Sequence, residues 1–408
     1  MTPLWLAIPM ITLCVCSAAF AAYWTIASYR IGRAFSSLPT AQDGVGLAPP
    51  NLSVCVIVPA HNEAGHIAHL VESLRAQTHE QFSVVLALDR CTDETEAVAR
   101  EAIGDDPRFE IVPIAECPDD WAGKVHAAHT GYTRSGRAQS ADLLLFTDAD
   151  CTFAPEALNA TAALLESRGL DLLSLFSSLG TRRWFEKLAQ PAAGFELGRW
   201  FPLTRANAKK GQLPKRPFAN GQFMLFRAAA YRALGGHGAQ EIRAALLEDV
   251  AFATQYGTAR RPTGLLLADG VVRCRMYETW AEFRRGWKRI YTESANRKPD
   301  RLAKAAMQLR MMSTLPLLAA VCFALAWLVP WEDQPLAGLA LGLPMLGTLS
   351  WAYALIRVQR GTHAPIWMIP LWPIGGWLVA GILAEAARDL RKGVPTRWGG
   401  KDYIREAR

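Results

Sequence analysis

The 408-residue sequence lacks the glycine-rich motifs with which many nucleotide-binding folds hold phosphate. Neither the P-loop pattern G-x-x-x-x-G-K-[ST] nor the dinucleotide pattern G-x-G-x-x-G occurs, which excludes a Walker or Rossmann cradle. The eight cysteines include no C-x-x-C pair and no zinc-ligand spacing. We interpret those in the hydrophilic part of the chain as reduced cytosolic thiols, some of them buried as small apolar residues.

Charged residues are scarce as well, at 20% of the chain, whereas hydrophobic residues make up 51%. The net charge of +7 comes without an RNA-binding aromatic motif or a basic recognition helix. We therefore expect no nucleic acid partner and attribute the positive charge to a surface that faces anionic lipid.

A long apolar run begins the chain. Residues 4–24 are almost uninterruptedly apolar, which is long enough to cross a bilayer, and the first basic residues, Arg30 and Arg33, follow this run. That order of charge favours an uncleaved anchor over residues 1–33 with its N-terminus outside. A cleaved signal peptide, with its cleavage site near residues 18–21, is the alternative.

Three further apolar runs, rich in tryptophan, occupy residues 301–386, and a basic tail, residues 387–408, follows them. The positive-inside rule places both this tail and the hydrophilic middle of the chain in the cytoplasm. Three spans between them would leave the tail outside, so we expect one run to be re-entrant. The sequence thus predicts a multi-pass protein of the cytoplasmic membrane, with two to three C-terminal membrane segments. The three runs are 312–331, 336–356 and 366–383.

The middle of the chain, residues 51–300, alternates strands with helices after a linker, residues 34–50. This order predicts an α/β fold with a mostly parallel sheet and helices on both faces. Ligands of such sheets collect beyond the carboxyl ends of the strands. The expected strands are 53–58, 82–88, 109–113 and 143–146, with helices over 63–77 and 97–102.

Asp148 and Asp150 directly follow the apolar strand 143–146. Carboxylate oxygens are ligands that Mg²⁺ and Mn²⁺ favour, and such an ion can neutralise a diphosphate leaving group. Taken alone, the pair is equally compatible with a solvated turn or a helix cap.

Polar residues also follow the first two strands. Residues 59–63 end the first strand, where Asn62 and Glu63 offer polar groups to a base or ribose, or Asn62 caps the next helix. Asp89 ends the second strand and can accept a hydrogen bond from a base imide. Lys124, beside a glycine, can reach a phosphate as a point charge, or is an ordinary surface lysine.

Two motifs in the second half of this region suggest an acceptor site. Gly221 allows close approach of the backbone to a sugar, and Gln222 can bond to hydroxyls. Glu248 and Asp249 are candidates for a general base that takes a proton from an attacking hydroxyl. The alternative is a carboxylate pair that interacts with a helix dipole.

In their order and spacing these motifs resemble those of family 2 glycosyltransferases, which have the GT-A fold, over roughly residues 50–295. The flanking apolar runs resemble the branch that glycosylates lipids, which includes ceramide glucosyltransferases and enzymes that act on carotenoid or hopanoid-type lipids. The resemblance implies that Asp249, next to Glu248, is the catalytic base and that Asp150 and Asp148 hold Mn²⁺ or Mg²⁺. It implies that the nucleotide sugar is bound by Pro59, Ala60, Asn62, Glu63, Asp89, Lys124 and Asp148.

One segment departs from the family pattern. Many relatives carry a Q-x-x-R-W motif, whereas residues 283–289 keep Trp287 and several basic residues without the glutamine. Arg285 or Lys288 can still pair with the diphosphate, and Trp287, together with Gln222, can line the acceptor site. The alternative is a basic amphipathic segment that lies on anionic lipid. The missing glutamine argues against processive polymer synthesis.

The expected function is therefore an inverting, metal-dependent transfer of a sugar from a nucleotide-diphosphate donor. We expect this donor to be a UDP-sugar. The acceptor is a lipid at the cytoplasmic face of the membrane. Transfer to a polyprenyl phosphate, processive polysaccharide synthesis and a non-catalytic lipid-binding scaffold are the alternatives. The sequence identifies neither the sugar nor the lipid.

Overall fold

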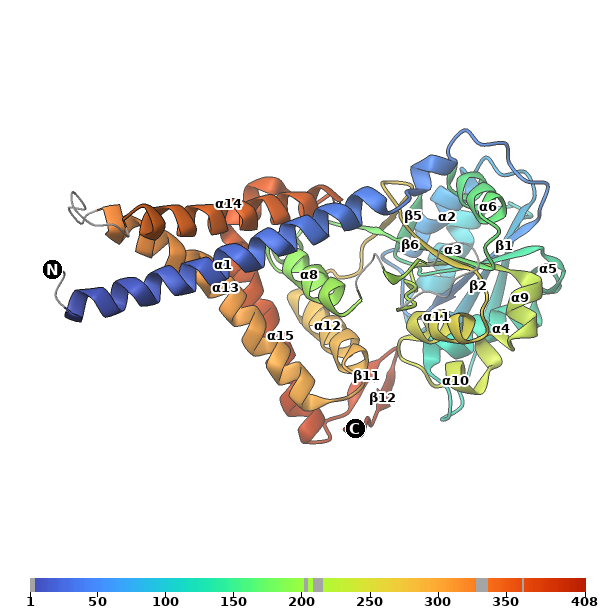
Figure 1. Ribbon diagram of the computed structural model, residues 1–408. Helices are drawn as coiled ribbons and strands as arrows, with labels where there is room; N and C mark the ends of the chain where they lie inside the picture. Colours follow the sequence, from blue (N-terminus) through green and yellow to red (C-terminus); the bar gives the residue numbers. More distant parts are fainter. Residues whose placement is uncertain (1–3, 202–204, 208–215, 328–336, 362) are drawn as a thin grey trace.

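The computed structural model describes residues 4–201, 205–207, 216–327, 337–361 and 363–408. An α/β domain forms one end of the molecule, and long helices project from it at the other (Figure 1). The first of these is α1 (Leu4–Ser37), which runs beyond the expected anchor and shortens the expected linker. Within that linker, Thr40 forms a bridge to Leu267 at the edge of the sheet.

The α/β domain is built on a seven-stranded sheet with the strand order β3-β2-β1-β4-β8-β6-β9. The four expected strands are present and pair in parallel, because their apolar residues can be buried on both faces. The sheet is mixed, however, since β8 runs antiparallel to both β4 and β6. The strands are β1 (Val54–Ala60), β2 (Phe82–Asp89), β3 (Phe109–Ile114), β4 (Leu143–Thr147), β6 (Leu172–Phe176), β8 (Phe223–Arg227) and β9 (Thr263–Leu267).

Helices cover both faces of this sheet, as the sequence predicts. Successive residues of β1 point to opposite faces, so Val56 packs in the core beneath α2, α3 and α6, and Ile57 packs beneath α4 and α11. The helix expected over 63–77 begins only at Ile67, because the preceding residues form a turn at the strand end. The helices are α2 (Ile67–Arg75), α3 (Thr95–Ile103), α4 (Gly123–Arg134), α5 (Gly136–Ser140), α6 (Ala157–Ser167), α9 (Ala228–Ala233), α10 (Gln240–Arg243) and α11 (Glu248–Thr258).

A second, three-stranded sheet lies beside the first. It has the order β5-β10-β7, formed by β5 (Cys151–Phe153), β10 (Val272–Cys274) and β7 (Ser178–Leu179). Because β5 begins directly after Asp150, this sheet fixes the position of the Asp148–Asp150 turn.

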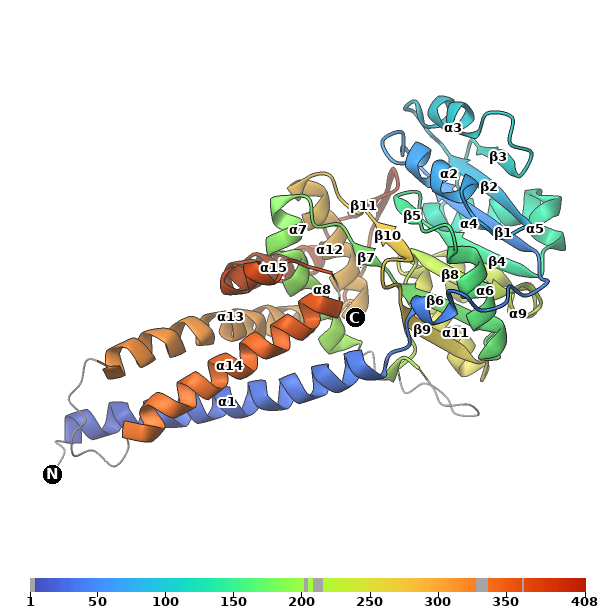
Figure 2. The same ribbon diagram turned by 90° about the horizontal axis from the view of Figure 1, so that it is seen from above.

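The remaining helices form a separate apolar core with α1. Within it, α1 packs along α14 and α13 packs along α15, and Trp24 stacks on Phe195 and meets Trp372 edge-on. Figure 2 shows α1, α13 and α14 extending together away from the α/β domain. These elements are α7 (Trp184–Leu188), α8 (Gln190–Trp200), α12 (Trp280–Ser294), α13 (Pro299–Trp327), α14 (Ala337–Gly361), η4 (Ile366–Leu371) and α15 (Trp372–Arg391).

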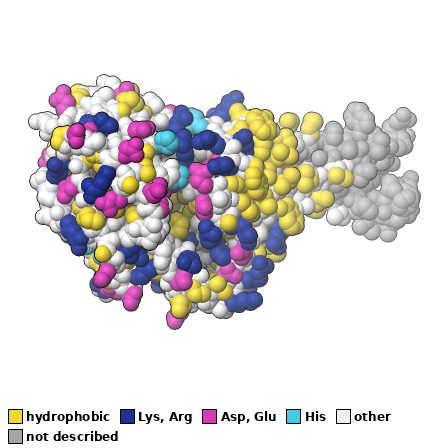
Figure 3. All heavy atoms as spheres, turned by 180° about the vertical axis from the view of Figure 1, so that it is seen from behind, with side chains coloured by type: hydrophobic (Ala, Val, Ile, Leu, Met, Phe, Trp, Pro, Cys, Tyr) yellow, Lys and Arg dark blue, Asp and Glu magenta, His cyan; other side chains and the backbone are white. Residues whose placement is uncertain are grey.

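Among the residues that the structure describes, one helix, Ile366–Arg391, is long and apolar enough to cross a membrane. The two to three C-terminal membrane segments that the sequence predicts are therefore not confirmed. Residues 328–336, which include the end of the run 312–331 and the start of the run 336–356, lie outside the described residues. Hydrophobic side chains nevertheless gather on the surface where the projecting helices leave the α/β domain, with Lys and Arg side chains beside them (Figure 3).

The residues expected to form a basic tail are folded. The helix α15 continues to Arg391, and an antiparallel hairpin follows, formed by β11 (Thr396–Trp398) and β12 (Lys401–Tyr403). Its two-residue turn consists of Gly399 and Gly400, with φ of 53° and 71°. Two successive positive φ angles are typical of the type I′ turn, which suits a two-residue hairpin and glycine. The tail thus returns to the α/β domain.

Candidate active site

A cavity of about 850 Å³ lies beyond the carboxyl ends of β1, β2 and β4, where an α/β sheet binds its ligands. The structure gathers almost all of the predicted site residues around it. Lys288 is the exception among them. The predicted residues that line the cavity are Pro59, Ala60, Asn62, Glu63, Asp89, Lys124, Asp148, Asp150, Gln222, Glu248, Asp249, Arg285 and Trp287.

The loop after β1 is tied to the loop after β2. Asn62 has a left-handed backbone, with φ of 57°, and its side chain accepts a hydrogen bond from the Thr92 N–H at 2.8 Å. The next N–H, of Glu63, donates to Thr95 Oγ1 at 2.7 Å. Asn62 therefore joins two loops instead of capping the helix that follows. Burial, followed by the charges of Asp150 and Asp148, raises the pKa of Glu63 to about 8.

Asp89 lies at the end of β2 and is only 2% exposed. Arg90 pairs with it through two hydrogen bonds, from Nε to Oδ1 at 2.9 Å and from Nη2 to Oδ2 at 2.6 Å. Such a bidentate contact fixes the plane of the carboxylate. Arg90 also donates from Nη2 to the carbonyl oxygen of Gly399 at 3.1 Å, which links this strand end to the C-terminal hairpin.

Lys124, near the start of α4, bridges two carboxylates. Its Nζ lies 2.6 Å from Asp148 Oδ1 and 2.7 Å from Glu248 Oε1. Burial lowers the pKa of Lys124, but the charges of Asp148 and Glu248 outweigh burial, so the pKa is raised overall. The lysine is therefore a permanent cation that joins the end of β4 to the start of α11.

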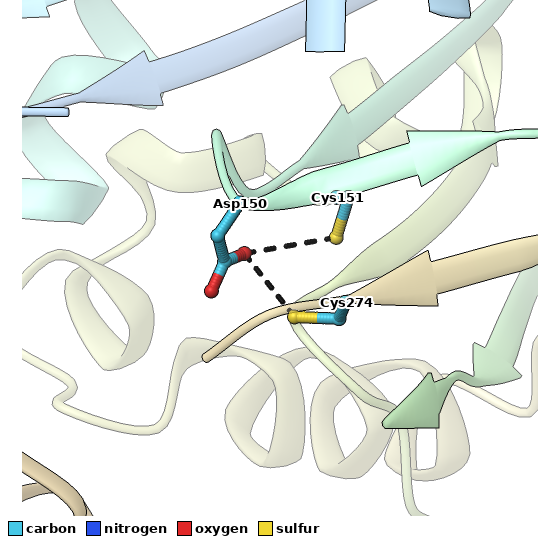
Figure 4. A group of neighbouring side chains, drawn as sticks. All are labelled: Asp150, Cys151 and Cys274. Atoms are coloured by element: carbon cyan, nitrogen blue, oxygen red, sulfur yellow. Dashed lines mark hydrogen bonds between the residues drawn. The ribbon is translucent and has the colours of Figure 1, made fainter. Parts of the chain in front are cut away.

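Two thiols donate hydrogen bonds to the same oxygen of Asp150. Its Oδ1 accepts hydrogen bonds from Cys274 Sγ at 3.2 Å and Cys151 Sγ at 3.8 Å, and its second oxygen points away from both thiols (Figure 4). Burial and then the charge of Asp148 raise the pKa of Asp150 to about 6. Burial also raises the pKa of Cys274 well above its usual value, so this cysteine acts as a hydrogen-bond donor.

These groups fit a hard divalent cation better than a soft one. Asp150, Cys151 and Cys274 place one ligand atom each within 4.8 Å of one another, a set that taken alone suggests a thiolate site. However, a thiol that stays protonated is a poor ligand. The outward oxygen of Asp150 and the carboxylate of Asp148, both on the cavity, are the oxygen ligands that Mg²⁺ or Mn²⁺ prefers.

Asp249 lies in the first turn of α11, with Glu248 before it. Its Oδ2 accepts a hydrogen bond from the Gly221 N–H at 2.8 Å. A Cβ at Gly221 would lie 3.0 Å from Lys124 Nζ and 3.1 Å from Glu248 Oε1, so a side chain there would crowd both charged groups. Burial and then the charge of Glu248 raise the pKa of Asp249 to about 6. Burial acts on Glu248 in the same direction, but Lys124 outweighs it and lowers the pKa of that carboxyl.

Apolar residues line the cavity on the side of α8 and α12, beside the charged Glu282, Arg285 and Arg289 of α12. Trp287, on α12, is 3% exposed and lines this side. The following Lys288 differs from the prediction: its Nζ lies 2.6 Å from Asp389 Oδ2 and 3.3 Å from Glu385 Oε1, both on α15. Lys288 therefore joins two helices and does not face the diphosphate site. The other apolar residues on that side of the cavity are Phe176, Leu179, Leu197, Phe218, Met276 and Ile290.

The cavity also contains basic and aromatic residues that the sequence does not predict for the site, among them Arg289, Arg397 and Trp398. Arg289 belongs to the basic segment 283–289, one residue beyond Lys288. The other two belong to the C-terminal hairpin. The Gly-Gly pair at residues 399–400 is typical of a hairpin turn and could have predicted the hairpin.

Comparison with known proteins defines the class of this fold and site. Residues 55–235 match the family described as glycosyl transferase family 2. Residues 55–235 therefore form a domain similar to those of this family, and the chain is a glycosyltransferase.

The curated relatives of the chain have names that describe a more specific activity. The 4,4'-diaponeurosporenoate glycosyltransferase of Staphylococcus aureus strain MRSA252 is 28% identical over 359 residues, which cover 86% of this chain and 88% of the relative. The protein of the same name from strain USA300 is 27% identical over 283 residues, covering 67% and 70% of the two chains.

Solved structures resemble the chain more distantly. Mannosyltransferase PcManGT from Pyrobaculum calidifontis, in complex with GDP-Man and Mn²⁺, has a TM-score of 0.49 and 16% identity over 92% of this chain and 98% of its own. TarS 1–349 of S. aureus, in complex with UDP-GlcNAc, has a TM-score of 0.39 and 17% identity over 87% and 97%. At these levels of similarity neither structure bears on the roles of individual residues.

Proposed function

We propose that the protein transfers a sugar from a nucleotide-diphosphate donor to an apolar lipid, with inversion at the anomeric carbon and with the help of a divalent cation. The observation that carries this proposal is the two-sided character of one cavity. One side, at the strand ends and the start of α11, holds the carboxylates Asp148, Asp150 and Asp249, and the side of α8 and α12 holds the apolar residues that include Trp287. The name of the S. aureus relatives supports a lipid-type acceptor.

The donor would lie against the strand ends. Pro59, Ala60, Asn62 and Glu63 form the wall after β1, and Asp89 ends β2. A uracil imide N–H would donate to the Asp89 carboxylate, whose plane Arg90 fixes. This contact makes UDP the expected donor nucleotide.

The diphosphate would lie near Lys124 and the Asp148–Asp150 turn. A divalent cation bound there supplies positive charge to the leaving group. Asp150 and Asp148 would hold it, and Lys124, already held between two carboxylates, adds a fixed positive charge. Fixed charges of this kind stabilise a departing diphosphate without reorganisation during the reaction.

The acceptor hydroxyl or carboxyl would meet the sugar beside Asp249. A base whose pKa is about 6 is ionised at neutral pH and still basic enough to share the proton of an attacking hydroxyl. The Gly221 N–H holds one oxygen of Asp249 in place. The apolar residues on the side of α8 and α12 would receive the lipid chain and keep water away from the anomeric carbon.

The projecting helices would carry this domain on the membrane. Leu317 and Val321 on α13 and Leu349 on α14 are more than half exposed, which suits lipid better than water. The start of α1, the end of α13 and the start of α14 lie at the same distal end (Figure 1). We infer that these three helices cross the bilayer. The helix Ile366–Arg391 is apolar enough to cross as well, but much of it is buried against α13, α12 and α8, so we place it at the cytoplasmic surface, with both the α/β domain and the C-terminus in the cytoplasm.

Donor turnover by the purified full-length protein tests this proposal. The protein, in detergent with total lipid extract, is given labelled UDP- and GDP-sugars with Mn²⁺ or Mg²⁺. We expect a lipid-extractable labelled product that is lost with EDTA and in Asp150→Ala, but kept in Asp300→Ala, a control at an exposed carboxylate of α13. Absence of product and of nucleotide release with every donor would favour the lipid-binding scaffold.

A further inference from the structure

The C-terminal hairpin, residues 396–403, forms one wall of the cavity. It is distant in the sequence from the elements that it contacts: Tyr403 bonds to Gly123, at the start of α4, across 280 residues. Arg397, Trp398, Gly399 and Gly400 all line the cavity. They lie on the side of the loops after β1 and β2, which is the side proposed for the nucleotide.

Hydrogen bonds fasten the hairpin to that side. Tyr403 Oη accepts from the Gly123 N–H at 2.9 Å, at the start of α4. The Gly399 carbonyl oxygen accepts from Arg90 Nη2 at 3.1 Å, and Lys401 Nζ donates to the Pro118 carbonyl oxygen at 2.7 Å. The hairpin therefore contacts the same loops that carry Asp89 and Lys124.

The turn itself is tightly fitted. A Cβ at Gly400 would lie 2.8 Å from His61 Nε2, whereas a Cβ at Gly399 would meet nothing within 4 Å. His61 Nδ1 in turn lies 2.6 Å from the Asp89 carbonyl oxygen. The position of the turn is thus set by direct contact with the end of β1.

The positive charge on the hairpin's side of the cavity indicates that the hairpin does more than pack against the domain. Carboxylates dominate the sheet side of the cavity, and its lysine, Lys124, is already paired with two of them. Arg289 lies on the hairpin's side, with its Cζ 3.8 Å from the centre of the Trp398 ring, and Arg397 is on the hairpin itself. Within the described part of the chain, no ion pair joins Arg289 or Arg397 to a carboxylate. A bound diphosphate carries the negative charge that such guanidinium groups bind.

We propose that the C-terminal hairpin is part of the donor site: Arg397 and Arg289 bind the diphosphate of a nucleoside diphosphate, Trp398 holds Arg289 in place, and the Gly399–Gly400 turn covers the nucleoside. This inference rests on the proposed function and adds to it the residues that bind the donor. It makes the C-terminus, which follows the membrane-associated helices, a component of nucleotide binding.

Calorimetric titration of the full-length protein in detergent with UDP and with GDP, in the presence of Mn²⁺, tests the charge. We expect Arg397→Ala to weaken binding of the preferred nucleotide about tenfold, the effect of losing a charge-assisted contact. Arg391→Ala is the matched control, because Arg391 is an exposed arginine of the same C-terminal segment that pairs with Asp300 on α13. In turnover assays, Arg397→Ala is expected to raise KM for the donor and leave KM for the acceptor unchanged.

The two turn glycines provide a second matched pair. Alanine at either position meets the same strained positive φ, but only Gly400→Ala also meets His61. We expect Gly400→Ala to weaken nucleotide binding more than Gly399→Ala does. Hydrogen exchange adds a readout in the unaltered protein: the peptide that contains residues 396–403 is expected to exchange more slowly when the nucleotide is bound.

The possible failures are distinguishable. If the unaltered protein binds nucleotide and forms product, but the Arg397 and Gly400 variants bind as it does and exchange in the hairpin is unchanged, the hairpin proposal is wrong and the proposed function stands. If the unaltered protein binds neither nucleotide and forms no product, both are wrong.

Discussion

Lys124 Nζ lies 2.7 Å from Glu248 Oε1, an ion pair that joins the half of the site at the strand ends to the half at the start of α11. The same ammonium group pairs with Asp148 at 2.6 Å. One cation thus holds Glu248 ionised, and the charge of Glu248 in turn contributes to the raised pKa of the neighbouring Asp249. The basicity of the proposed catalytic carboxylate therefore depends on a lysine that does not contact it as a hydrogen-bond partner.

Replacing Lys124 with methionine tests this dependence. The charge of Lys124 lowers the pKa of both Glu248 and Asp249, so its loss is expected to make this pair of carboxyls bind a proton more tightly. Loss of a fixed charge beside the leaving group is expected to reduce kcat about 10²-fold. The pH profile of the remaining activity is expected to move to higher pH. Lys392→Met, at an exposed position after α15, is the control, and an unshifted profile in Lys124→Met would contradict this view.

The pH dependence of the unaltered enzyme follows from Asp249. A general base is active when ionised, and the pKa of Asp249 is raised to about 6, so kcat/KM is expected to rise with pH, with its midpoint near 6, and to level off above that. Initial rates at saturating metal between pH 4.5 and 8 measure this. Asp249→Glu is expected to move the midpoint, which distinguishes Asp249 from the other carboxylates of the cavity. Activity that is already constant from pH 4.5 upward would contradict the assignment.

Glu63 is expected to affect stability in the opposite sense to a paired surface carboxylate. Its pKa is raised to about 8 in the folded protein, chiefly by burial, whereas the ordinary pKa of the carboxyl is 4.5. Between these two pH values the folded state keeps a proton that the unfolded chain has lost. Stability from this group is full below pH 4.5 and falls as the pH rises towards 8. In EDTA, Glu63→Gln is expected to match the Tm of the unaltered protein near pH 5 and exceed it near pH 8. Equal Tm values at both pH values would contradict the raised pKa.

Lys288 and Arg289 are adjacent but are expected to give different defects. Lys288→Met removes the ion pairs with Glu385 and Asp389 and is expected to cost about 1 kcal/mol of stability, with little change in KM for the donor. Arg289→Met removes a cation from the cavity wall and is expected to raise that KM. Thermal unfolding and donor kinetics of both variants separate the two roles. A raised donor KM in Lys288→Met would restore the original prediction for that residue.

The strands of the site were predictable because their apolar character is dictated locally. Strands β1, β2 and β4 are buried on both faces, so each appears in the sequence as a short apolar run that ends at a polar motif. The gathering of Asp89 and Asp148 at one edge then follows from the parallel alternation of strands and helices.

Other parts depend on tertiary packing that no local pattern encodes. Nothing in the run that forms β8 shows that it enters the sheet antiparallel between β4 and β6. The orientation of Lys288 and Arg289 depends on where α15 packs against α12, because neighbouring positions of a helix face different directions. The C-terminal hairpin was interpreted as a tail, since its short strands are polar and its partners, Arg90 and Gly123, are distant in the sequence.

The most direct test of sugar transfer to a lipid at this cavity compares the full-length protein with Asp249→Asn, using a labelled nucleotide sugar and total lipid extract. We expect a labelled lipid from the unaltered protein and none from the variant, with nucleotide binding equal in the two. Undiminished product from Asp249→Asn would contradict the proposed base and favour a polyprenyl phosphate, an acceptor that is already ionised. Absence of labelled lipid from the unaltered protein with every donor would contradict the transfer itself.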